Sequence, residues 1–493
     1  MKPRLASERF QPLFDPRGVL VAGVSSHPGK FGFVALHNIV TQGFTGPVFG
    51  TNRDGGEVLG VPMLASADDL PADAPVDLVV VCTPAVANPD LLRSCARRGI
   101  TAAFVTSAGY GEAGEQGRAD EADLVALADD LGILLAGPNG QGLASTPSRL
   151  CAQIVAPFPP PGAIGIVSQS GNFVSSFQNL ARATGVGVSR AVSAGNAAAV
   201  TVPDFLEYYA SDAATRVGLA YVEGVGDGRA FFTRVRDVAA TKPLVLLKGG
   251  TTTGGQRAAA SHTGALASDV RIFDGLCRQA GVTRADTVED AFEAAATFAT
   301  QPLPRGPRVA VVTTAGGWGV VTADAISRSD LELATLPDDL RVAIDERLPP
   351  RWSRNNPIDL AGGETRDTVP EILDLVTRHP DVDAVIYLGI GIQSNQARLM
   401  REGRFASDPN LERIVAYHER QDARFAQAAA AVSDATGKPV LTATELAVAD
   451  PANPGPRTVR DTGRLCYPSS YRAVRALEHL WHRARYQQTR GQA

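Results

Sequence analysis

The sequence predicts a doubly wound α/β fold that is repeated along the chain. Short apolar strands rich in β-branched residues alternate with Ala- and Leu-rich helical stretches, glycine-rich turns follow several strands, and two proline-rich segments interrupt the alternation. Strands that are apolar throughout, each followed by a helix, are typical of parallel sheets covered by helices on both faces.

Ten segments carry the strand pattern, and a further strand is expected to end near Thr51. The ten are 18–24, 76–82, 102–106, 132–136, 163–168, 217–222, 244–248, 308–313, 384–388 and 439–442. The proline-rich segments Pro157–Gly162 and Gln301–Pro307 continue neither a helix nor a central strand. They divide the chain into three predicted α/β domains, 1–156, 157–301 and 302–493.

Composition narrows the class of protein. The 493 residues carry a net charge of −5 with no basic stripe, which argues against a nucleic-acid partner. The five cysteines show no Cys-x-x-Cys pair and so predict neither a zinc site nor a disulfide framework. The polar N-terminus and the absence of a long apolar run predict a cytoplasmic protein without a membrane partner.

The first strand ends in a glycine-rich turn, Ala22–Gly32, that leads into an expected helix. Free amides and the helix dipole make such a turn a natural phosphate site, although a single turn of this kind more often serves packing. The dinucleotide fingerprint is absent because Ser25 occupies the position of its second glycine, and no acid is placed for a ribose after Thr51. Both points disfavour an NAD enzyme.

Four loops of this segment resemble the CoA-binding domain of succinyl-CoA synthetase α subunits and their relatives. They are the turns Gly23–Gly32 and Gly137–Asn139 and the segments Val79–Pro84 and Ser107–Gly111. The resemblance implies a Rossmann-like domain with CoA along the carboxyl edge of its sheet. It also implies a set of pocket residues, which are Gly23, Ser25, Lys30, Gly32, Asn52, Thr83, Pro84, Ser107 and Asn139. One departure from the family's Gly-Pro-Asn-Cys turn is Gly140, in place of the cysteine.

The second segment contains a histidine, His262, in the run Ala-Ala-Ser-His-Thr-Gly-Ala. Small neighbours on both sides predict an accessible loop, and a neutral imidazole can accept and pass on a phosphoryl group. Glu223, at the end of the strand 217–222, is placed to orient such a ring. The amides of the Ser170-Gly171-Asn172 turn open a helix and can hold a phosphate. The alternative is that His262 is an ordinary surface residue, and His27 is at best a pocket-wall residue.

This segment resembles the second domain of the NDP-forming acyl-CoA synthetases, and most of all the ADP-forming acetate–CoA ligase branch. In that family a loop histidine is phosphorylated, a glutamate assists it, and helix N-termini bind the phosphate. The resemblance therefore implies that His262 and Glu223 are catalytic and that Ser170, Gly171 and Asn172 bind phosphate.

The third segment continues the resemblance. A strand and glycine-rich turn, Arg308–Gly319, and the stretch Asn355–Gly363 are similar to the family's flavodoxin-like ligase domain, which supplies the other half of the phosphate site. The residues implied are Gly316, Gly317 and Asp359. The predicted architecture is thus a Rossmann-like CoA-binding domain followed by two flavodoxin-like, doubly wound domains.

No segment is left for the ATP-grasp domain on which this family exchanges phosphate with a nucleotide. The first hypothesis is therefore an α-type subunit of an NDP-forming acyl-CoA synthetase, which converts acyl-CoA, phosphate and ADP into carboxylic acid, CoA and ATP. A separate ATP-grasp β subunit would bring ATP or ADP and Mg²⁺, and family habit implies an oligomer. The alternative is a CoA- or acyl-CoA-binding regulatory protein without full turnover. The sequence identifies neither the acid nor a preference between ADP and GDP.

Overall fold

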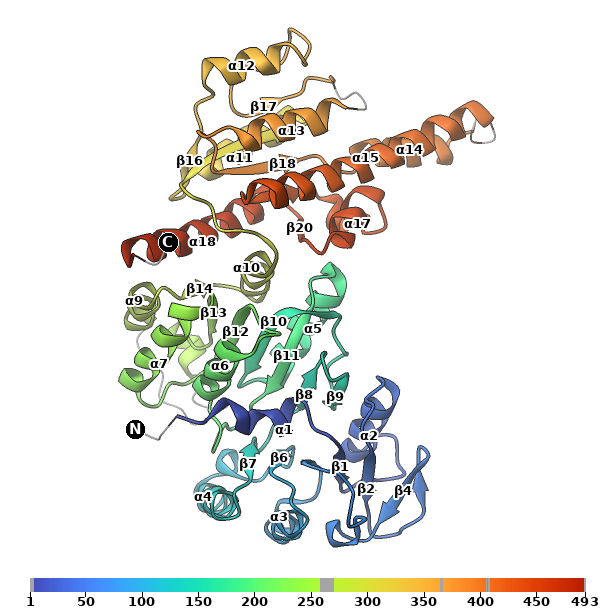
Figure 1. Cartoon of the computed structure of the whole chain (residues 1–493), viewed down its shortest axis with the longest axis vertical. Helices are drawn as coiled ribbons and strands as arrows, with labels where there is room; N and C mark the ends of the chain where they lie inside the picture. Colours follow the sequence, from blue (N-terminus) through green and yellow to red (C-terminus); the bar gives the residue numbers. More distant parts are fainter. Residues whose placement is uncertain (1–3, 258–269, 364–366, 405, 407, 492–493) are drawn as a thin grey trace. The chain divides into compact units, whose positions relative to one another are not determined.

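The computed structural model describes residues 4–257, 270–363, 367–404, 406 and 408–491. Two compact units make up the chain. The first comprises Met1–Ala183 and Gly187–Ala295, and the second comprises Thr184–Val186 and Ala296–Ala493. The first unit contains two sheets and the second unit contains one (Figure 1). Strands and helices alternate in all three, which confirms the predicted α/β class.

The first sheet has seven strands in the order β3-β4-β2-β1-β5-β6-β7, and all but β3 are parallel. The strands are β1 (Val19–Ala22), β2 (Val48–Thr51), β3 (Glu57–Val58), β4 (Val61–Leu64), β5 (Leu78–Val81), β6 (Ala102–Val105) and β7 (Leu134–Ala136). The helices around it are η1 (Ser7–Phe10), α1 (Gln11–Phe14), α2 (Phe31–Thr41), η2 (Ala67–Asp69), η3 (Ala85–Ala87), α3 (Asn88–Arg97), η4 (Gly111–Ala113) and α4 (Glu115–Asp130).

Alternate residues of each strand enter two different cores. Val19 and Val21 of β1 pack in the same cluster as Leu36 of α2. Leu20 of β1 packs in another cluster with Leu92 of α3. Because side chains alternate between the faces of a strand, a strand that is apolar throughout must be covered on both sides. This pattern is the physical origin of the doubly wound layer.

The second sheet also has seven strands, in the order β14-β13-β12-β10-β11-β8-β9. They are β8 (Gly142–Ser145), β9 (Leu150–Gln153), β10 (Pro161–Ser168), β11 (Val188–Ser193), β12 (Val217–Val222), β13 (Leu244–Lys248) and β14 (Thr283–Ala285). The helices are α5 (Gly171–Thr184), α6 (Val202–Ser211), α7 (Gly228–Thr241), α9 (Val270–Ala280) and α10 (Val288–Thr300). The strands β10 to β14 are parallel, whereas β8 and β9 form an antiparallel hairpin against β11.

This hairpin connects the two sheets of the first unit. The chain leaves the last strand of the first sheet, β7, and after five residues it enters β8 at one side of the second sheet. The segment 137–141 therefore lies where the two layers of the unit meet. The hairpin strands are buried throughout, so this connection is part of the core of the unit.

The second unit holds a parallel sheet in the order β16-β15-β18-β19-β20, with β17 beside β15. Its strands are β15 (Arg308–Thr313), β16 (Glu332–Leu333), β17 (Ile358–Asp359), β18 (Ala384–Leu388), β19 (Val440–Ala443) and β20 (Cys466–Tyr467). Its helices are α11 (Gly316–Ser327), α12 (Asp338–Asp345), α13 (Thr368–Arg378), α14 (Ile392–Glu402), α15 (Pro409–Thr436), α16 (Leu446–Ala449), α17 (Pro454–Asp461) and α18 (Ser470–Thr489). The helices α12, α13 and α15 share one core with the central strands.

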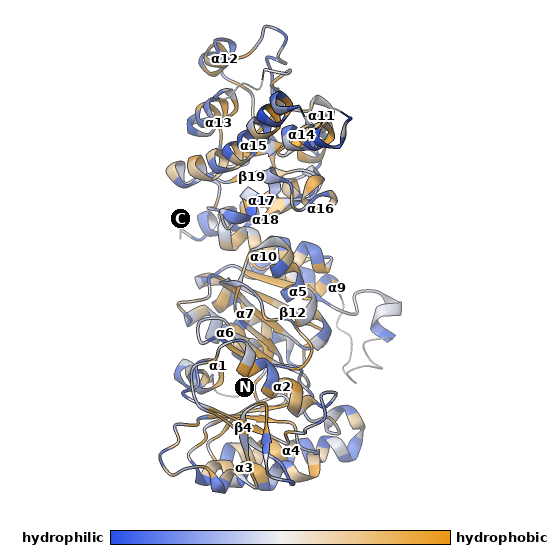
Figure 2. Ribbon diagram, turned by 90° about the vertical axis from the view of Figure 1, so that its right-hand side faces the viewer, coloured by the Kyte–Doolittle hydropathy of each residue, from blue (hydrophilic) through white to orange (hydrophobic). Residues whose placement is uncertain are grey.

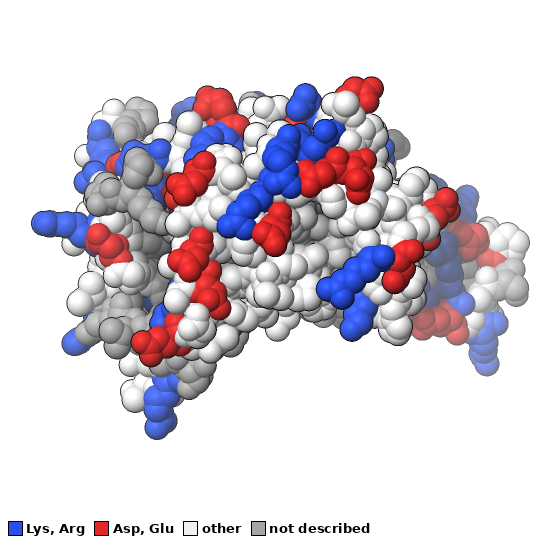
Figure 3. Space-filling model, turned by 90° about the horizontal axis from the view of Figure 1, so that it is seen from below, with Lys and Arg blue, Asp and Glu red and all other residues white. Residues whose placement is uncertain are grey.

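Polarity follows this layering. Strands of the sheets are coloured hydrophobic in Figure 2, while the outer helices show both colours. On the face seen in Figure 3, Lys and Arg are interspersed with Asp and Glu instead of forming a field of one sign. None of the helices in the described part of the chain is both long and apolar enough to cross a bilayer.

Candidate active site

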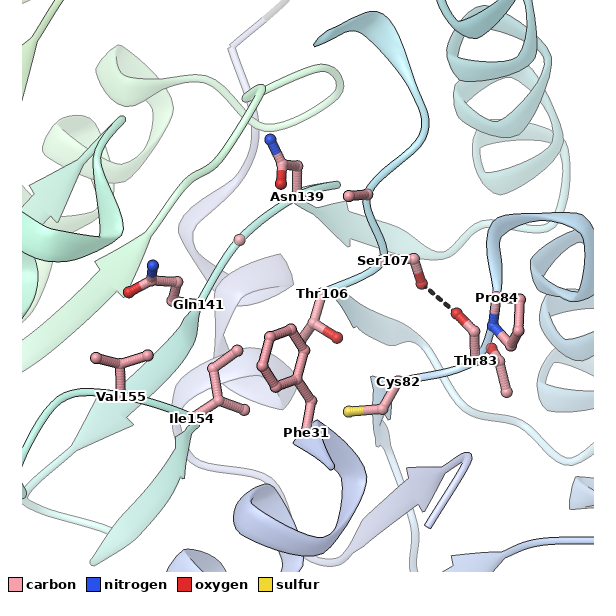
Figure 4. Close-up of a pocket in the computed structure, with 12 residues that line it drawn as sticks. Phe31, Cys82, Thr83, Pro84, Thr106, Ser107, Asn139, Gln141, Ile154 and Val155 are labelled. Atoms are coloured by element: carbon pink, nitrogen blue, oxygen red, sulfur yellow. Dashed lines mark hydrogen bonds between the residues drawn. The ribbon is translucent and has the colours of Figure 1, made fainter. Parts of the chain in front are cut away.

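A cavity of about 400 Å³ opens at the carboxyl ends of the strands β5 and β6 of the first sheet. Its wall also includes the connection from β7 to β8 and the end of the hairpin strand β9 (Figure 4). The lining residues are Phe31, Cys82, Thr83, Pro84, Thr106, Ser107, Ala108, Asn139, Gly140, Gln141, Ile154 and Val155. Ligands of open α/β sheets bind at this edge of the strands, so the cavity is the best candidate for the binding site.

Four residues predicted from the sequence meet in this cavity: Thr83, Pro84, Ser107 and Asn139. They come from the ends of three different strands of the first sheet, which the parallel topology brings to one edge. The other predicted pocket residues belong to neighbouring turns and are not part of the cavity wall. They are Gly23, Ser25, Lys30, Gly32 and Asn52.

Hydrogen bonds fix the loops around the cavity. The hydroxyl of Ser107 donates to the carbonyl oxygen of Thr83 at 2.6 Å, which joins two neighbouring loops (Figure 4). Buried Asn88 accepts a hydrogen bond from the Thr83 hydroxyl at 2.8 Å and donates to Ser107 at 3.2 Å and to the Tyr110 hydroxyl at 2.8 Å. A wall held in this way is organised before any ligand arrives.

Asn139 adopts a left-handed backbone conformation, with φ of +59°. Its amide N–H donates to the carbonyl oxygen of Ser107, and its side-chain amide donates to Asn196 at 3.2 Å. Asn196 in turn donates to Glu112 at 2.6 Å and to Glu121 at 2.7 Å. Burial acts to raise the pKa of Glu112, but the bonds from Asn196 and the Gly109 amide hold that pKa below its ordinary value. The acid stays charged and keeps this network intact at neutral pH.

The first glycine-rich turn depends on two glycines. Gly23 has φ of +84°, and a Cβ on it would lie 2.9 Å from the carbonyl of Cys82. Gly32 lies in the first turn of α2, and a Cβ there would lie 2.2 Å from the carbonyl oxygen of Gly23. Because neither residue has a side chain, the start of α2 can pack against the end of β1. Ser25 accepts a hydrogen bond from the amide of His27, and the side chain of Asn52 accepts from the amides of Asp54 and Gly55.

Cys82 is the one ionisable residue among those that line the cavity. Burial raises the pKa of its thiol to about 11, although a hydrogen bond from Thr106 acts in the opposite direction. At neutral pH the thiol is protonated, and a protonated thiol is a poor nucleophile. Cys82 is therefore a wall residue rather than a reactive group.

Glu223 follows the last residue of β12 and is buried. Its Oε1 accepts a hydrogen bond from the Tyr221 hydroxyl at 3.2 Å, and its amide donates to Gln169 at 2.6 Å. The ammonium of Lys248 donates to its carbonyl oxygen at 2.7 Å. Burial lowers the pKa of Lys248, while the charge of Glu223 acts to raise it. The backbone of Glu223 is thus held by Gln169 and Lys248, from the two neighbouring strands, and this positions its carboxylate.

The turn before α5 is closed by Ser168. Its hydroxyl accepts from the amide of Ser170 at 3.0 Å and donates to the carbonyl oxygen of the same residue at 2.6 Å. The helix then begins at Gly171. The amides of Gly171 and Asn172 lie in its first turn, where a helix offers no backbone acceptor for them. Of the three amides predicted to bind phosphate, that of Ser170 is engaged within the turn.

The second unit repeats this turn. The Thr313 hydroxyl accepts from the amide of Ala315 at 3.0 Å and donates to its carbonyl oxygen at 2.8 Å, and α11 begins at Gly316. A Cβ on Gly316 would lie 2.5 Å from a carboxylate oxygen of Asp359, whereas Gly317 has open space around it. The predicted Gly316, Gly317 and Asp359 therefore come together at one helix N-terminus.

His262 lies outside the described residues, so its predicted role is carried by the sequence alone.

Several residues of the cavity were not predicted as site residues. Gln141 and Gly140 adjoin the predicted turn 137–139, and Phe31 lies between Lys30 and Gly32. Ile154 and Val155 come from the end of a hairpin whose strands carried no recognised signal, so the sequence offered no means of placing them.

Three family models match the chain: a CoA binding domain over residues 17–146, a succinyl-CoA ligase like flavodoxin domain over 161–298, and a ligase-CoA domain over 309–392. The cavity described above lies largely within the first of these matches. Fold and site together define the class of CoA-dependent acid–thiol ligases.

The chain is 33% identical over 383 residues to the alpha subunit of ADP-forming acetate–CoA ligase I of Pyrococcus furiosus, covering 77% of this chain and 82% of that protein. It is 36% identical over 376 residues to ADP-forming acetate–CoA ligase I of Archaeoglobus fulgidus, covering 76% and 54% respectively. The structure of the dinucleotide-forming acetyl-coenzyme A synthetase 1 of Ca. Korarchaeum cryptofilum, in complex with phosphate and ADP, matches with a TM-score of 0.82 and 28% identity over 98% of this chain and 99% of that chain. The chain belongs to the ADP-forming acetate–CoA ligase family, the NDP-forming acyl-CoA synthetases.

Proposed function

We propose that this chain is the CoA-binding, phosphohistidine-carrying subunit of an ADP-forming acid–CoA ligase. The reaction converts acyl-CoA, phosphate and ADP into a carboxylic acid, CoA and ATP. The observation that carries the proposal is the pairing of a cavity at the edge of the CoA binding domain with buried Glu223 and the opening of α5 in the same unit.

CoA is proposed to occupy the cavity lined by Thr83, Pro84, Ser107 and Asn139, with its phosphates toward the turn that includes Gly23, Ser25, Lys30 and Gly32. Asn52 follows β2, at the same edge of the sheet. An anion near the start of α2 is favoured by the helix dipole. The thioester end of the molecule then faces the connection from β7 to β8.

Phosphate is proposed to sit at the first turn of α5, on the amides of Gly171 and Asn172. Its oxygen attacks the thioester carbonyl, the carbon–sulfur bond breaks, and CoA leaves as the acyl phosphate forms. His262 then attacks phosphorus, the phosphorus–oxygen bond to the acyl group breaks, and the carboxylate departs. Glu223 orients the imidazole and stabilises the positive charge that it gains.

The phosphoryl group must next reach ADP. We propose that a separate ATP-grasp β subunit holds the nucleotide and the Mg²⁺ that accompanies it, since relatives of this chain are named as alpha subunits. Gly316 and Gly317, at the opening of α11 in the second unit beside Asp359, are proposed to bind phosphate too. The assembly is accordingly proposed to be an oligomer of α and β chains in the cytoplasm.

The test is labelling of the chain with ³²P-phosphate in the presence of acetyl-CoA. An acid-labile, base-stable label is expected on the wild type and is expected to be absent from His262→Ala. Glu223→Gln should lower the rate of labelling by about 10²–10⁴-fold, because the ring loses its orienting carboxylate. A label that survives His262→Ala contradicts the proposed role of this histidine. CoA binding without any label would favour the regulatory alternative, although membership of a ligase family argues against it.

A further inference from the structure

The side-chain amide of Asn139 has a definite orientation in the wall of the cavity. Asn139 is exposed, and Figure 4 shows its nitrogen turned away from the other labelled side chains. This nitrogen, Nδ2, donates to Oδ1 of Asn196 at 3.2 Å. None of the described residues donates a hydrogen bond to the oxygen, Oδ1, of Asn139. The open group of this amide is therefore its carbonyl oxygen.

Two carboxylates decide which way Asn196 faces. Its Nδ2 donates to Oε2 of Glu112 at 2.6 Å and to Oε2 of Glu121 at 2.7 Å, so both hydrogens of the amino group are used. A charged carboxylate can accept a hydrogen bond but cannot donate one. The group of Asn196 that faces the two acids must therefore be its amino group, and its carbonyl oxygen must face Asn139.

The two acids are held in turn by backbone amides of the loop after β6. Glu112 accepts from the amides of Gly109 and Tyr110, and Glu121 accepts from the amide of Gly111 at 3.1 Å. Burial acts to raise the pKa of Glu112, but the bonds from Asn196 and Gly109 keep that pKa below its ordinary value. A chain of hydrogen bonds thus runs from the backbone of this loop through the acids to the amide of Asn139.

The backbone around Asn196 is fixed as well. Its amide donates to the carbonyl oxygen of Pro138 at 3.0 Å. Gly195 has φ of +57°, and a Cβ on it would lie 2.1 Å from the same carbonyl oxygen. The turn after β11 therefore packs directly on the loop that carries Asn139, which keeps the two asparagine side chains within reach of each other.

An acceptor at this position requires a donor on the ligand. Under the proposed function, on which this inference rests, the thioester end of CoA faces the connection from β7 to β8, and Asn139 is part of that connection. The donor of CoA nearest to the thioester is the N–H of the amide that carries the cysteamine group. This N–H and the carbonyl oxygen of Asn139 are complementary.

We infer that Asn196 is a positioning residue, which makes Asn139 accept a hydrogen bond from the cysteamine amide N–H of CoA. Asn196 does not line the cavity and acts through Asn139. Without Asn196, the amide of Asn139 is free to turn over and to present its amino group to the ligand instead. A site built to pair an N–H disfavours an analogue that lacks it, because two oxygen atoms then face each other.

The experiment compares the binding of CoA with that of an analogue in which oxygen replaces this N–H, so that the amide becomes an ester. Calorimetry on the full chain requires neither nucleotide nor partner. The wild type should bind CoA roughly tenfold more tightly than the ester. In Asn196→Ala the ratio should fall to about one, because the amide of Asn139 can then turn and donate to the ester. Asn395→Ala, which removes an exposed contact with Arg398, is the matched control and should keep the wild-type ratio.

The outcomes separate this inference from the proposed function. Wild-type protein that binds CoA and the ester equally well overturns the inference and leaves the proposed function standing. An Asn196→Ala variant that keeps the tenfold ratio also overturns it, because Asn196 would then serve only the fold. Should Asn196→Ala fail to fold, Asn196→Ser takes its place, since serine has no amide to orient Asn139. Failure of the wild type to bind CoA overturns both.

Discussion

The hydroxyl of Tyr221 donates a hydrogen bond to Oε1 of Glu223 over an oxygen–oxygen distance of 3.2 Å. The two residues are separated by one position at the end of β12, so their side chains point to the same face of the sheet. The ring of Phe173 in α5 packs against that of Tyr221, with 4.2 Å between their centroids. The tyrosine thus fixes the proposed orienting acid with respect to the proposed phosphate site.

Tyr221→Phe removes this hydroxyl and keeps the ring. We expect the rate of histidine phosphorylation to fall roughly tenfold, because one neutral hydrogen bond to the acid is lost. The KM for CoA should not change, since Tyr221 lies outside the lining of the cavity proposed for CoA. Tyr471→Phe, at a half-exposed position of α18, is the matched control. A parallel loss of CoA affinity and thermal stability would mean that Tyr221 serves only the fold.

Ser107→Ala breaks the bond that joins the loops after β5 and β6. We expect CoA to bind about fivefold more weakly, which corresponds to the roughly 1 kcal/mol of one hydrogen bond. Equilibrium dialysis with labelled CoA measures this change. Ser327→Ala, on the exposed side of α11, removes a hydroxyl that bonds only to its own helix and should leave the affinity unchanged. Equal affinities of the two variants would contradict the proposed position of CoA.

Gly32→Ala introduces a methyl group 2.2 Å from the carbonyl oxygen of Gly23. Because the neighbouring atom is backbone, the start of α2 must move away from the end of β1. We expect a loss of about 1–3 kcal/mol in the free energy of unfolding, together with weaker CoA binding. Gly275→Ala in α9 has open space around it and should be neutral or slightly stabilising. Urea titration of both variants tests this prediction. A free energy of unfolding that is the same in Gly32→Ala as in the wild type would contradict it.

Arg190 forms a buried ionic cluster in the first unit. Its guanidinium lies 2.7 Å from Asp15 and 3.2 Å from Asp212, and it also contacts Ser145. Arg190→Leu leaves the nearly buried Asp212 without its cation, so we expect a loss of about 3–5 kcal/mol in the free energy of unfolding. The exposed pair of Arg93 and Asp90 offers the control, since Arg93→Leu should cost less than about 1 kcal/mol. Similar losses from both substitutions would contradict this account.

The same cluster predicts a dependence of stability on pH. Burial acts to raise the pKa of Asp212, but hydrogen bonds from Arg190 and Thr215 outweigh it and hold that pKa below its ordinary value. A carboxyl with a lowered folded-state pKa stabilises the fold above its unfolded pKa of about 3.9, and this contribution disappears as the pH falls through the folded value. The difference in unfolding midpoint between wild type and Asp212→Asn should be constant from pH 7 to 5 and should shrink below about pH 4. A difference that grows on acidification would contradict it.

Much of the fold was predictable because its signals are local. Each of the ten predicted segments contains a strand, since continuous β-branched runs favour a buried parallel sheet. The structure also contains strands without that signal, such as β8, β9 and β11. Two of these, β8 and β9, form an antiparallel hairpin. Ile154 and Val155 follow β9 and line the cavity. Pairing of this kind depends on partners far along the chain, which a local pattern does not contain.

The sequence by itself determined the α/β class, the family and the residue types of the predicted site. The resemblance to the family implied Thr83, Ser107 and Asn139, and the strand pattern placed Glu223 at the end of its strand. Only the tertiary structure decided that Gln141 lines the cavity and contacts Gly171, and that Tyr221 donates a hydrogen bond to Glu223. The physical reason is that strand order and packing of glycines such as Gly140 and Gly171 set the distances between loops. The type of residue at each position can be read from the sequence, whereas the distance between two residues depends on how the whole core packs.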